Sequence, residues 1–260
     1  MKTICIFNQK GGVGKTTTNI NLAAYLAMSG YKVLTIDIDP QGNTTSGLGI
    51  DKRGLETSMY DVITSDASLK DVIIHSNLIS NLYIAPSTME LAGAEVEVIV
   101  KDDRERILLN KINEVREEFD FVFIDCPPSL GVLTINALTC CDSVLIPIQC
   151  EFYALEGVGQ LINTVKLINK SLNPNLKIEG VIMTMYDYRT KLSNEVFNEV
   201  KNFFGDVVYE NKIPRNIRLA ESPSFGLPIM LYDEKCKGAE AYSELTKEFL
   251  KRQNMVKGDK

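Results

Sequence analysis

A ten-residue segment near the N-terminus, residues 8–17, restricts the possible folds more than any other part of the chain. It reads NQKGGVGKTT and lies between an apolar run at Thr3–Phe7 and a helical pattern at Thr17–Ser29. A strand, a glycine-rich loop, Gly-Lys-Thr and a helix together are the context of a phosphate-binding loop, or P-loop. Glycines let backbone N–H groups turn toward phosphate oxygens, and the helix directs its positive end to the same place. The segment therefore predicts a nucleotide-phosphate site.

Each residue type in this loop has a predicted role. We expect Lys15 to reach the β- and γ-phosphates, the Thr16 hydroxyl to ligate Mg²⁺, and Thr17 to donate to the α-phosphate. The strict P-loop pattern has glycine where Gln9 stands, but adjacent glycines follow and an additional lysine precedes them. The predicted cofactor-binding residues of the loop are Lys10, Gly11, Gly12, Val13, Gly14, Lys15, Thr16 and Thr17.

Two aspartates follow predicted strands at the edge of the sheet where the loop should lie. Asp39 comes directly after the run Val33–Asp37, and Asp125 ends the run Phe121–Asp125. Ligands of open α/β sheets bind beyond the carboxyl ends of the strands. We expect Asp125 to hold a Mg²⁺-bound water and Asp39 to orient the water that attacks ATP. A structural cap of a strand–helix turn is the alternative for Asp39.

Short apolar runs alternate with helical patterns along the whole chain. Runs that lack polar alternation suit strands covered on both faces, so the pattern predicts one doubly wound, mostly parallel α/β sheet. We expect a single ATPase domain over residues 1–252 and a frayed polar tail over residues 253–260. Besides the segments already named, the expected strands are Ser143–Ile148 and Ile178–Thr184, and the expected helices are Arg104–Glu118, Leu133–Cys140, Gly157–Lys170, Leu192–Phe204 and Ala239–Arg252.

Composition narrows the functional classes. The six cysteines show no C-x-x-C spacing and His75 is the only histidine, which disfavours zinc sites and histidine-based acid–base chemistry. The cysteines are interpreted as reduced core thiols. No apolar run is long enough to span a bilayer and no signal peptide is evident, so a cytoplasmic location is expected. The net charge of −6 means that any nucleic-acid contact must come from a local patch.

Five blocks together resemble the ParA/Soj family of chromosome- and plasmid-partitioning ATPases. The first is the deviant Walker A motif at residues 10–16, with Lys10 as its signature lysine. The others are DIDPQGN at 37–43, DCPPS at 125–129, QCEFYALEG at 149–157 and IPRNIRLAE at 213–221. The resemblance covers essentially residues 1–250.

This resemblance implies an ATP- and Mg²⁺-dependent switch with slow hydrolysis. Family dimers enclose two ATP molecules, and the signature lysine, here Lys10, crosses to the partner's nucleotide; Lys10, Lys15 and Asp39 are the implied catalytic residues. Pro214 and Asn216 match positions that contact adenine. The ATP-bound homodimer is expected to bind double-stranded DNA without sequence preference on the nucleoid. A ParB-type centromere-binding protein is the expected activator.

Two basic stretches, residues 188–191 and 212–218, are candidates for the DNA contact and carry little opposing charge in the sequence. A solvated surface is the alternative interpretation of such stretches. The family resemblance favours Arg189 and Arg218 as DNA-binding residues, whereas Arg215 adjoins the expected adenine contacts.

Four other classes of protein remain as alternatives. A MinD-like membrane-associated ATPase would need a basic amphipathic C-terminal helix, but the last helical pattern mixes glutamates with lysines, so no membrane partner is expected. An iron protein of the nitrogenase type would need cluster-bridging cysteines, which residues 129–137 lack. Nothing marks the acceptor site of a metabolic ligase. A DNA-binding protein with a vestigial nucleotide site is disfavoured because every catalytic position is filled.

Overall fold

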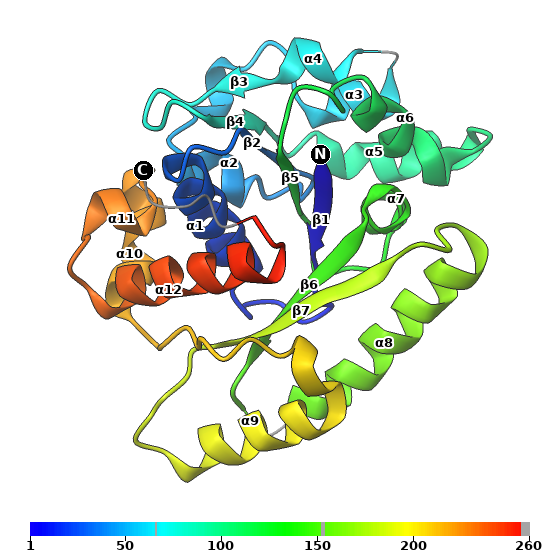
Figure 1. Ribbon diagram of the computed structural model, residues 1–260. Coiled ribbons are helices and arrows are strands. Elements are labelled where there is room, and N and C mark those ends of the chain that lie inside the picture. Colours follow the sequence, from blue (N-terminus) through cyan, green and yellow to red (C-terminus); the bar gives the residue numbers. More distant parts are fainter. Residues whose placement is uncertain (66, 152–153, 256–260) are drawn as a thin grey trace.

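The computed structural model describes residues 1–65, 67–151 and 154–255 of the chain. These residues form a seven-stranded sheet, with helices on both of its faces (Figure 1). The strand order is β3-β4-β2-β5-β1-β6-β7, and every neighbouring pair is parallel except β3 and β4. The strands are β1 (Lys2–Ile6), β2 (Val33–Asp37), β3 (Ile74–His75), β4 (Leu82–Ala85), β5 (Phe121–Asp125), β6 (Ser143–Gln149) and β7 (Lys177–Thr184).

The helices fill the connections between the strands. They are α1 (Lys15–Met28), α2 (Asn43–Gly47), α3 (Met59–Thr64), α4 (Leu69–Val72), α5 (Leu91–Glu97), α6 (Ile107–Asn113), α7 (Val132–Cys140), α8 (Ala154–Ser171), α9 (Lys191–Phe204), α10 (Ile217–Glu221), α11 (Ile229–Tyr232) and α12 (Lys237–Arg252). Short 3-10 turns lie at Lys52–Gly54, Val98–Val100, Arg104–Arg106, Gly205–Val207 and Ser222–Phe225. The predicted doubly wound α/β class is confirmed.

The core explains why the strands read as continuous apolar runs. Successive residues of β1 point to opposite faces, so Ile4 and Ile6 pack on the face covered by α1 and α12. Cys5 packs instead against the layer that contains α5 to α9, as do Val122 and Ile124 on β5. Because both faces of the sheet are covered and buried, period-two alternation between polar and apolar residues is absent from the central strands.

One predicted helix is wrong in extent. Residues 104–118 form a 3-10 turn followed by the short helix α6, which ends at Asn113. Beyond it the backbone N–H groups of Glu114, Val115 and Glu118 bond to carbonyls three residues back, not four. This tighter spacing turns the chain and seats the buried Val115 before β5 begins. The apolar periodicity alone did not distinguish this turn from a continuing helix.

The strand register defines the functional edge of the sheet. Ile6 of β1 lies opposite Asp125 of β5, and Asp125 in turn lies opposite Asp37 of β2. From β1 the chain proceeds to β2 on one side, while β6 and β7 occupy the other side. The loop at residues 8–14 therefore leaves the sheet where the strand order reverses, which is where α/β sheets bind their ligands.

The C-terminal helix α12 packs beside α1. The Tyr242 hydroxyl lies 3.1 Å from the Thr18 hydroxyl, and the Tyr25 hydroxyl donates to the Ala239 carbonyl at 2.8 Å. After α12, the Gln253 side chain accepts a hydrogen bond from Lys2. The rest of the expected tail, residues 256–260, lies outside the described residues. Among the described helices, none has the length and apolarity to cross a membrane.

Candidate nucleotide-binding site

The P-loop leads into helix α1, whose N-terminus has no side-chain cap. Gly14 is the N-cap of α1 in the left-handed conformation, with φ of 90°, and no side chain caps the helix. The first backbone N–H groups of α1 are thus left for another acceptor. Gly12 is also left-handed, with φ of 75°, and a Cβ at Gly11 or Gly12 would meet no protein atom within 4 Å. The loop has open space on the side where phosphates would lie.

Side chains on either side hold this loop in place. Asn8 donates to the Pro147 carbonyl at 2.8 Å and accepts from the Lys10 backbone N–H at 3.0 Å. Gln9, at the position where the strict pattern has glycine, donates to the Thr164 hydroxyl at 3.2 Å. Gln9 therefore ties the loop to α8 and does not interrupt it.

Lys15 is a buried cation, with 7% of its surface exposed. Its ammonium donates to the Lys10 carbonyl at 3.1 Å. Burial lowers the pKa of Lys15, and the nearby charges of Asp125 and Asp39 oppose that effect. Desolvation strengthens its interaction with an incoming anion, because little solvent remains to screen it.

Asp125 supplies a carboxylate that fits a hydrated metal ion. Its Oδ2 accepts hydrogen bonds from the hydroxyls of Thr16 at 2.7 Å and Thr44 at 2.8 Å. Its Oδ1 is buried without a hydrogen-bond partner. Burial raises the pKa of Asp125 to about 6, and the two threonine hydroxyls work against that rise. A buried, unpaired oxygen beside a threonine hydroxyl suits Mg²⁺, which prefers oxygen ligands and retains its waters.

Asp37 is a site residue that we did not predict. It is fully buried, and its Oδ2 accepts from the backbone N–H of Thr45 at 2.8 Å and from its hydroxyl at 2.7 Å. Burial, and then the neighbouring charge of Asp125, raise the pKa of Asp37 to about 8. The signal that could have revealed it is a pair of aspartates that end two adjacent strands.

Asp39 lies at a tightly bonded turn after β2. It is buried, its backbone N–H donates to Asp37 Oδ1 at 3.2 Å, and its own Oδ1 accepts from the Gln41 N–H at 2.9 Å. The Asp39 carbonyl accepts from Gly42 at 2.8 Å. Gly42 is left-handed, and a Cβ there would lie 2.7 Å from the Ser87 carbonyl, so only glycine fits. One carboxylate oxygen of Asp39 thus builds the turn.

A cavity of about 260 Å³ adjoins the P-loop. Gly14 and Thr17 line one side of it, and Pro214 and Asn216 line the other. Asn216 also caps α10 by accepting from the Leu219 N–H at 3.2 Å. Met185 lines the same cavity in the left-handed conformation, with φ of 50°, a strained arrangement for a residue with a side chain. The structure brings both predicted adenine contacts next to the phosphate loop.

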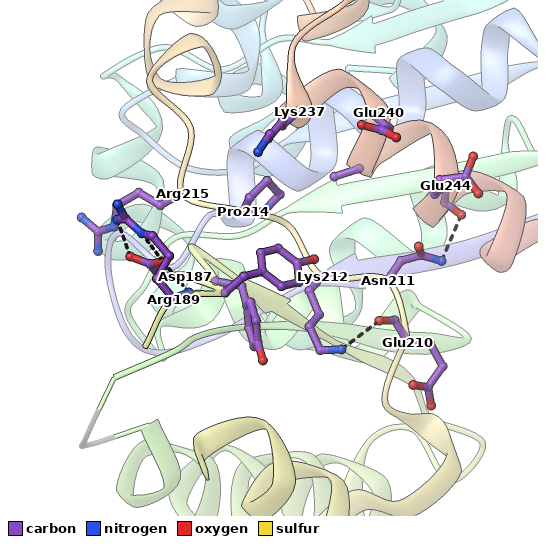
Figure 2. A pocket seen from close by; sticks show the side chains of 13 residues that line it. Asp187, Arg189, Glu210, Asn211, Lys212, Pro214, Arg215, Lys237, Glu240 and Glu244 are labelled. Atoms are coloured by element: carbon purple, nitrogen blue, oxygen red, sulfur yellow. Dashed lines mark hydrogen bonds and ion pairs between the residues drawn. The ribbon is translucent and has the colours of Figure 1, made fainter. Parts of the chain in front are cut away.

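A larger cavity of about 590 Å³ lies beside the first and shares Pro214 and Arg215 with it (Figure 2). Arg189 lines it and forms a two-point ion pair with Asp187, at 2.9 and 2.8 Å. Arg218, on α10, pairs with Glu221 at 2.9 Å and lies 3.4 Å from Asp233. Our interpretation that these basic stretches carry little opposing charge is therefore wrong: Asp187 and Glu221 lie close to the two arginines in the sequence, and folding adds Asp233.

The signature lysine has a partner within the same chain. The Lys10 ammonium forms an ion pair with Glu151, and both side chains remain partly exposed, at 47% and 31%. Glu151 belongs to the family block at 149–157, of which positions 152 and 153 lie outside the described residues. The pair holds Lys10 against the segment that follows β6 in its own protomer.

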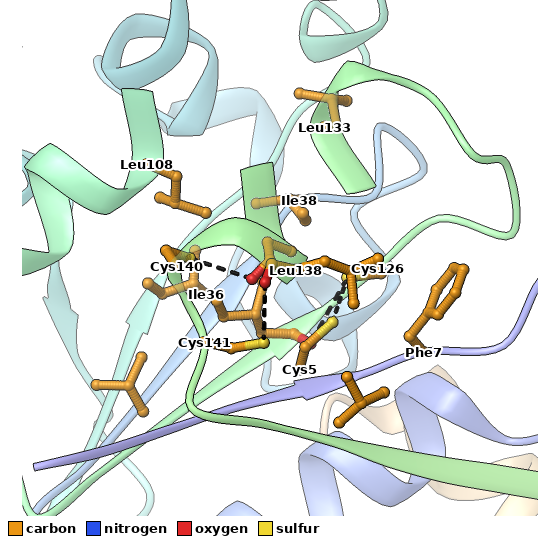
Figure 3. Close-up of a cluster of buried hydrophobic side chains, with 14 of the residues drawn as sticks. Cys5, Phe7, Ile36, Ile38, Leu108, Cys126, Leu133, Leu138, Cys140 and Cys141 are labelled. Carbon is orange, nitrogen blue, oxygen red and sulfur yellow. Dashed lines mark hydrogen bonds between the residues drawn. The ribbon is translucent and has the colours of Figure 1, made fainter. Parts of the chain in front are cut away.

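All six cysteines are free thiols, and four of them lie in the core as interpreted from the sequence, whereas Cys150 and Cys236 are only partly buried. Figure 3 shows Cys5, Cys126, Cys140 and Cys141 among apolar side chains. Their thiols are buried, and those of Cys5 and Cys126 are 3.1 Å apart. Burial raises the pKa of both thiols. Within the described part of the chain, no group of three or more acidic, cysteine or histidine side chains could hold a metal ion.

Known proteins are similar to this chain in fold and in sequence. A family model described as an AAA domain matches residues 1–178. The sporulation initiation inhibitor protein Soj of Bacillus subtilis is 56% identical over 95% of this chain and 97% of its own length. The chromosome-partitioning ATPase Soj of Treponema pallidum is 49% identical over 96% of this chain and 98% of its own.

One solved structure with this fold contains bound ligands. The crystal structure of cobyrinic acid a,c-diamide synthase from Mycobacterium smegmatis, with bound ATP analogue and magnesium, is 35% identical. It has a TM-score of 0.86 and covers 99% of this chain and 97% of that one. An ATP analogue and magnesium are thus bound by a protein that shares this fold.

We expect Lys15→Ala to lower ATP affinity about 10- to 100-fold, the range for loss of hydrogen bonds to a charged group. The free energy of unfolding should stay level or rise slightly, because the substitution removes a desolvated cation. Calorimetric titration with Mg-ATP measures the affinity, and Lys70→Ala, which changes an exposed lysine at another edge of the protein, is the control. Unchanged ATP binding by Lys15→Ala would contradict its assignment to the phosphates.

Proposed function

The chain belongs to the Soj/ParA family of chromosome-partitioning ATPases, and from this premise we propose that it is an ATP-dependent DNA-partitioning switch. In this proposal Mg-ATP drives formation of a homodimer that binds DNA without sequence preference. Slow hydrolysis, stimulated by a ParB-type partner, returns the protein to its monomeric state. The switch would segregate chromosome origins or plasmids, and it would act on the nucleoid.

The convergence of Lys15, Thr16 and Asp125 carries the proposal. A buried cation, a metal-binding hydroxyl and an unpaired carboxylate oxygen surround the open start of α1. Backbone N–H groups and Lys15 would hold the phosphates, while Thr16 and Asp125 would hold Mg²⁺. The metal, when bound, neutralises charge that develops on the β- and γ-phosphate oxygens. A surface turn has no need of a buried lysine and a buried carboxylate that is bonded to a threonine hydroxyl.

Asp39 is proposed to orient the attacking water. Its Oδ1 is occupied by the Gln41 N–H, so its other oxygen is the one that would accept from water. Asp37 acts through Asp39 as a positioning residue, since it accepts the Asp39 N–H and fixes Thr45. A water held in one orientation lowers the entropic cost of attack.

Lys10 is proposed to reach the γ-phosphate of the partner protomer. Within its own protomer its ammonium is paired with Glu151, and it stays nearly half exposed at the surface. To act on a second nucleotide, Lys10 must exchange Glu151 for phosphate. Such an exposed ion pair stabilises by at most about 1 kcal/mol, so phosphate can displace it.

The DNA contact is proposed to involve Arg189 and Arg218. The overall net charge of −6 makes a broad electrostatic attraction to DNA weak. A single protomer would then bind poorly, and dimerisation would place two small basic patches on one face. Affinity for DNA would in this way depend on ATP.

Two alternatives are less well supported. A MinD-like membrane role would require a basic surface helix, but α12 carries Glu240, Glu244 and Glu248 beside its lysines and packs on α1. The M. smegmatis relative is named as a synthase, but it is only 35% identical to this chain. The Soj protein of B. subtilis is 56% identical. Binding to liposomes of anionic lipid, or ATP turnover that requires a small-molecule acceptor, would favour these alternatives.

Lys10→Ala should retain ATP binding and lose dimerisation, hydrolysis or both. A cation supplied in trans accelerates related phosphoryl transfers by about 10³- to 10⁵-fold, and we expect a smaller factor for a slow ATPase. Light scattering with Mg-ATP measures the dimer, and phosphate release measures hydrolysis. Normal dimers with wild-type turnover would rule out the role in trans.

Asp39→Ala should trap the ATP-bound dimer and lengthen its residence on DNA, because binding groups remain while water is no longer oriented. Asp39→Asn is the sharper variant, since its Oδ1 can still accept the Gln41 N–H and preserve the turn. We expect both variants to lose most ATP hydrolysis in a phosphate-release assay. If Asp39→Asn hydrolyses ATP as the wild type does, Asp39 is only a structural cap.

The double variant Arg189→Glu, Arg218→Glu should lose DNA binding and keep ATP binding and dimerisation. Each phosphate contact contributes roughly −0.9 to the slope of log K against log salt, so removing four arginines per dimer removes up to about 3.6 from that slope. Fluorescence anisotropy with a duplex of arbitrary sequence, recorded across a salt series, measures the affinity for DNA and its dependence on salt. Retained salt-sensitive binding would place the DNA patch elsewhere.

A further inference from the structure

Both arginines of the proposed DNA contact are already bonded to carboxylates. Asp187 accepts from the Arg189 Nε at 2.9 Å and from its terminal nitrogen at 2.8 Å, an arrangement that occupies the guanidinium fork (Figure 2). Arg189 nevertheless remains 88% exposed. Because a carboxylate and a phosphate bind the same fork, DNA must compete with Asp187 for Arg189.

We propose that Asp187 is a brake on DNA binding: its carboxylate holds Arg189 within the folded protomer and must be exchanged for a DNA phosphate. This inference rests on the DNA-binding role proposed above and concerns its regulation. It assigns to Asp187 the function of keeping the affinity of each protomer low, so that only a dimer with two such patches holds DNA.

The local backbone does not require the charge of Asp187. Its Oδ1 also accepts the backbone N–H of Arg189 at 3.0 Å, which closes an Asx turn before α9. An asparagine keeps an acceptor oxygen at this position and can form the same turn. The negative charge therefore acts on the Arg189 side chain, and the turn can form without it.

Arg218 is restrained in a parallel way. Glu221 accepts from it at 2.9 Å and also accepts from the Tyr232 hydroxyl at 3.1 Å, which holds the carboxylate in place. Asp233 lies on the other side of the guanidinium, at 3.4 Å from its Nε. The two arginines of the patch thus share one feature, a carboxylate from a nearby position in the sequence that occupies the group needed for phosphate.

The chain offers a matched control. Asp51 and Arg53 repeat the spacing and geometry of Asp187 and Arg189, with the Arg53 N–H and Nε each 3.1 Å from Asp51 Oδ1. The second guanidinium contact, to Oδ2, is 3.2 Å. Asp51→Asn removes the same unit of charge from an equivalent turn, but its arginine is not part of the proposed DNA contact.

The experiment compares DNA affinity of the wild type, Asp187→Asn and Asp51→Asn, each saturated with a non-hydrolysable ATP analogue and Mg²⁺. Exposed ion pairs are weak, so we expect Asp187→Asn to bind a short duplex roughly 2- to 5-fold more tightly per protomer, or about 4- to 25-fold for the dimer. Asp51→Asn should differ little from the wild type. Equal gains in both variants would show a general charge effect and overturn the proposal.

A second comparison tests whether Asp187 acts through Arg189. In an Arg189→Gln background, Asp187→Asn should give no further gain in affinity, because the competition it relieves no longer exists. A full gain in that background would also overturn the brake. If Arg189→Glu, Arg218→Glu abolishes DNA binding but Asp187→Asn binds as the wild type does, only the brake fails and the proposed DNA contact stands.

Discussion

The parallel register of β2 and β5 places two aspartates, Asp37 and Asp125, side by side in a fully buried position. Two carboxylates at such short range cannot both ionise without nearby compensation, and burial raises the pKa of both. Threonine hydroxyls, a backbone N–H and the buried Lys15 provide part of that compensation. The remaining oxygen of Asp125 has no partner, which fits the hydrated Mg²⁺ that accompanies ATP. The site is thus arranged around charge that the protein does not neutralise by itself.

A second set of charges lies at the surface and behaves differently. Lys10, Arg189 and Arg218 are each paired with a carboxylate of their own chain, and each remains about half exposed or more. Exposed ion pairs of this kind are weak and can be exchanged for stronger anions. Buried groups would therefore hold the nucleotide, while exchangeable surface pairs would regulate the contacts with a second protomer and with DNA. This division would account for the proposed binding of an acidic chain to DNA in only one nucleotide state.

The sequence was most informative where burial and chemistry coincide. β2 and β5 lie where the β-branched apolar runs predicted them, and the P-loop precedes α1 as its glycines and lysine required. The strands β3 and β4 were missed because they are short, and because β3 lies at the edge of the sheet with His75 exposed. Asp37 was missed because its burial depends on a register between strands far apart in sequence. Of the partners of Arg218, Glu221 is three residues away in the sequence and could have been noticed, whereas Asp233 approaches only after α11 has folded against α10.

The central claim is that the nucleotide in the P-loop decides whether this protein holds DNA. The most direct measurement records molar mass and DNA affinity of the wild-type protein together, at one salt concentration, without nucleotide, with Mg-ADP and with Mg-ATP. We predict a dimer that binds DNA only with Mg-ATP, and a monomer with weak or undetectable DNA binding in the other two states. DNA binding of equal affinity in all three states, or tight binding by a monomer, would contradict the account.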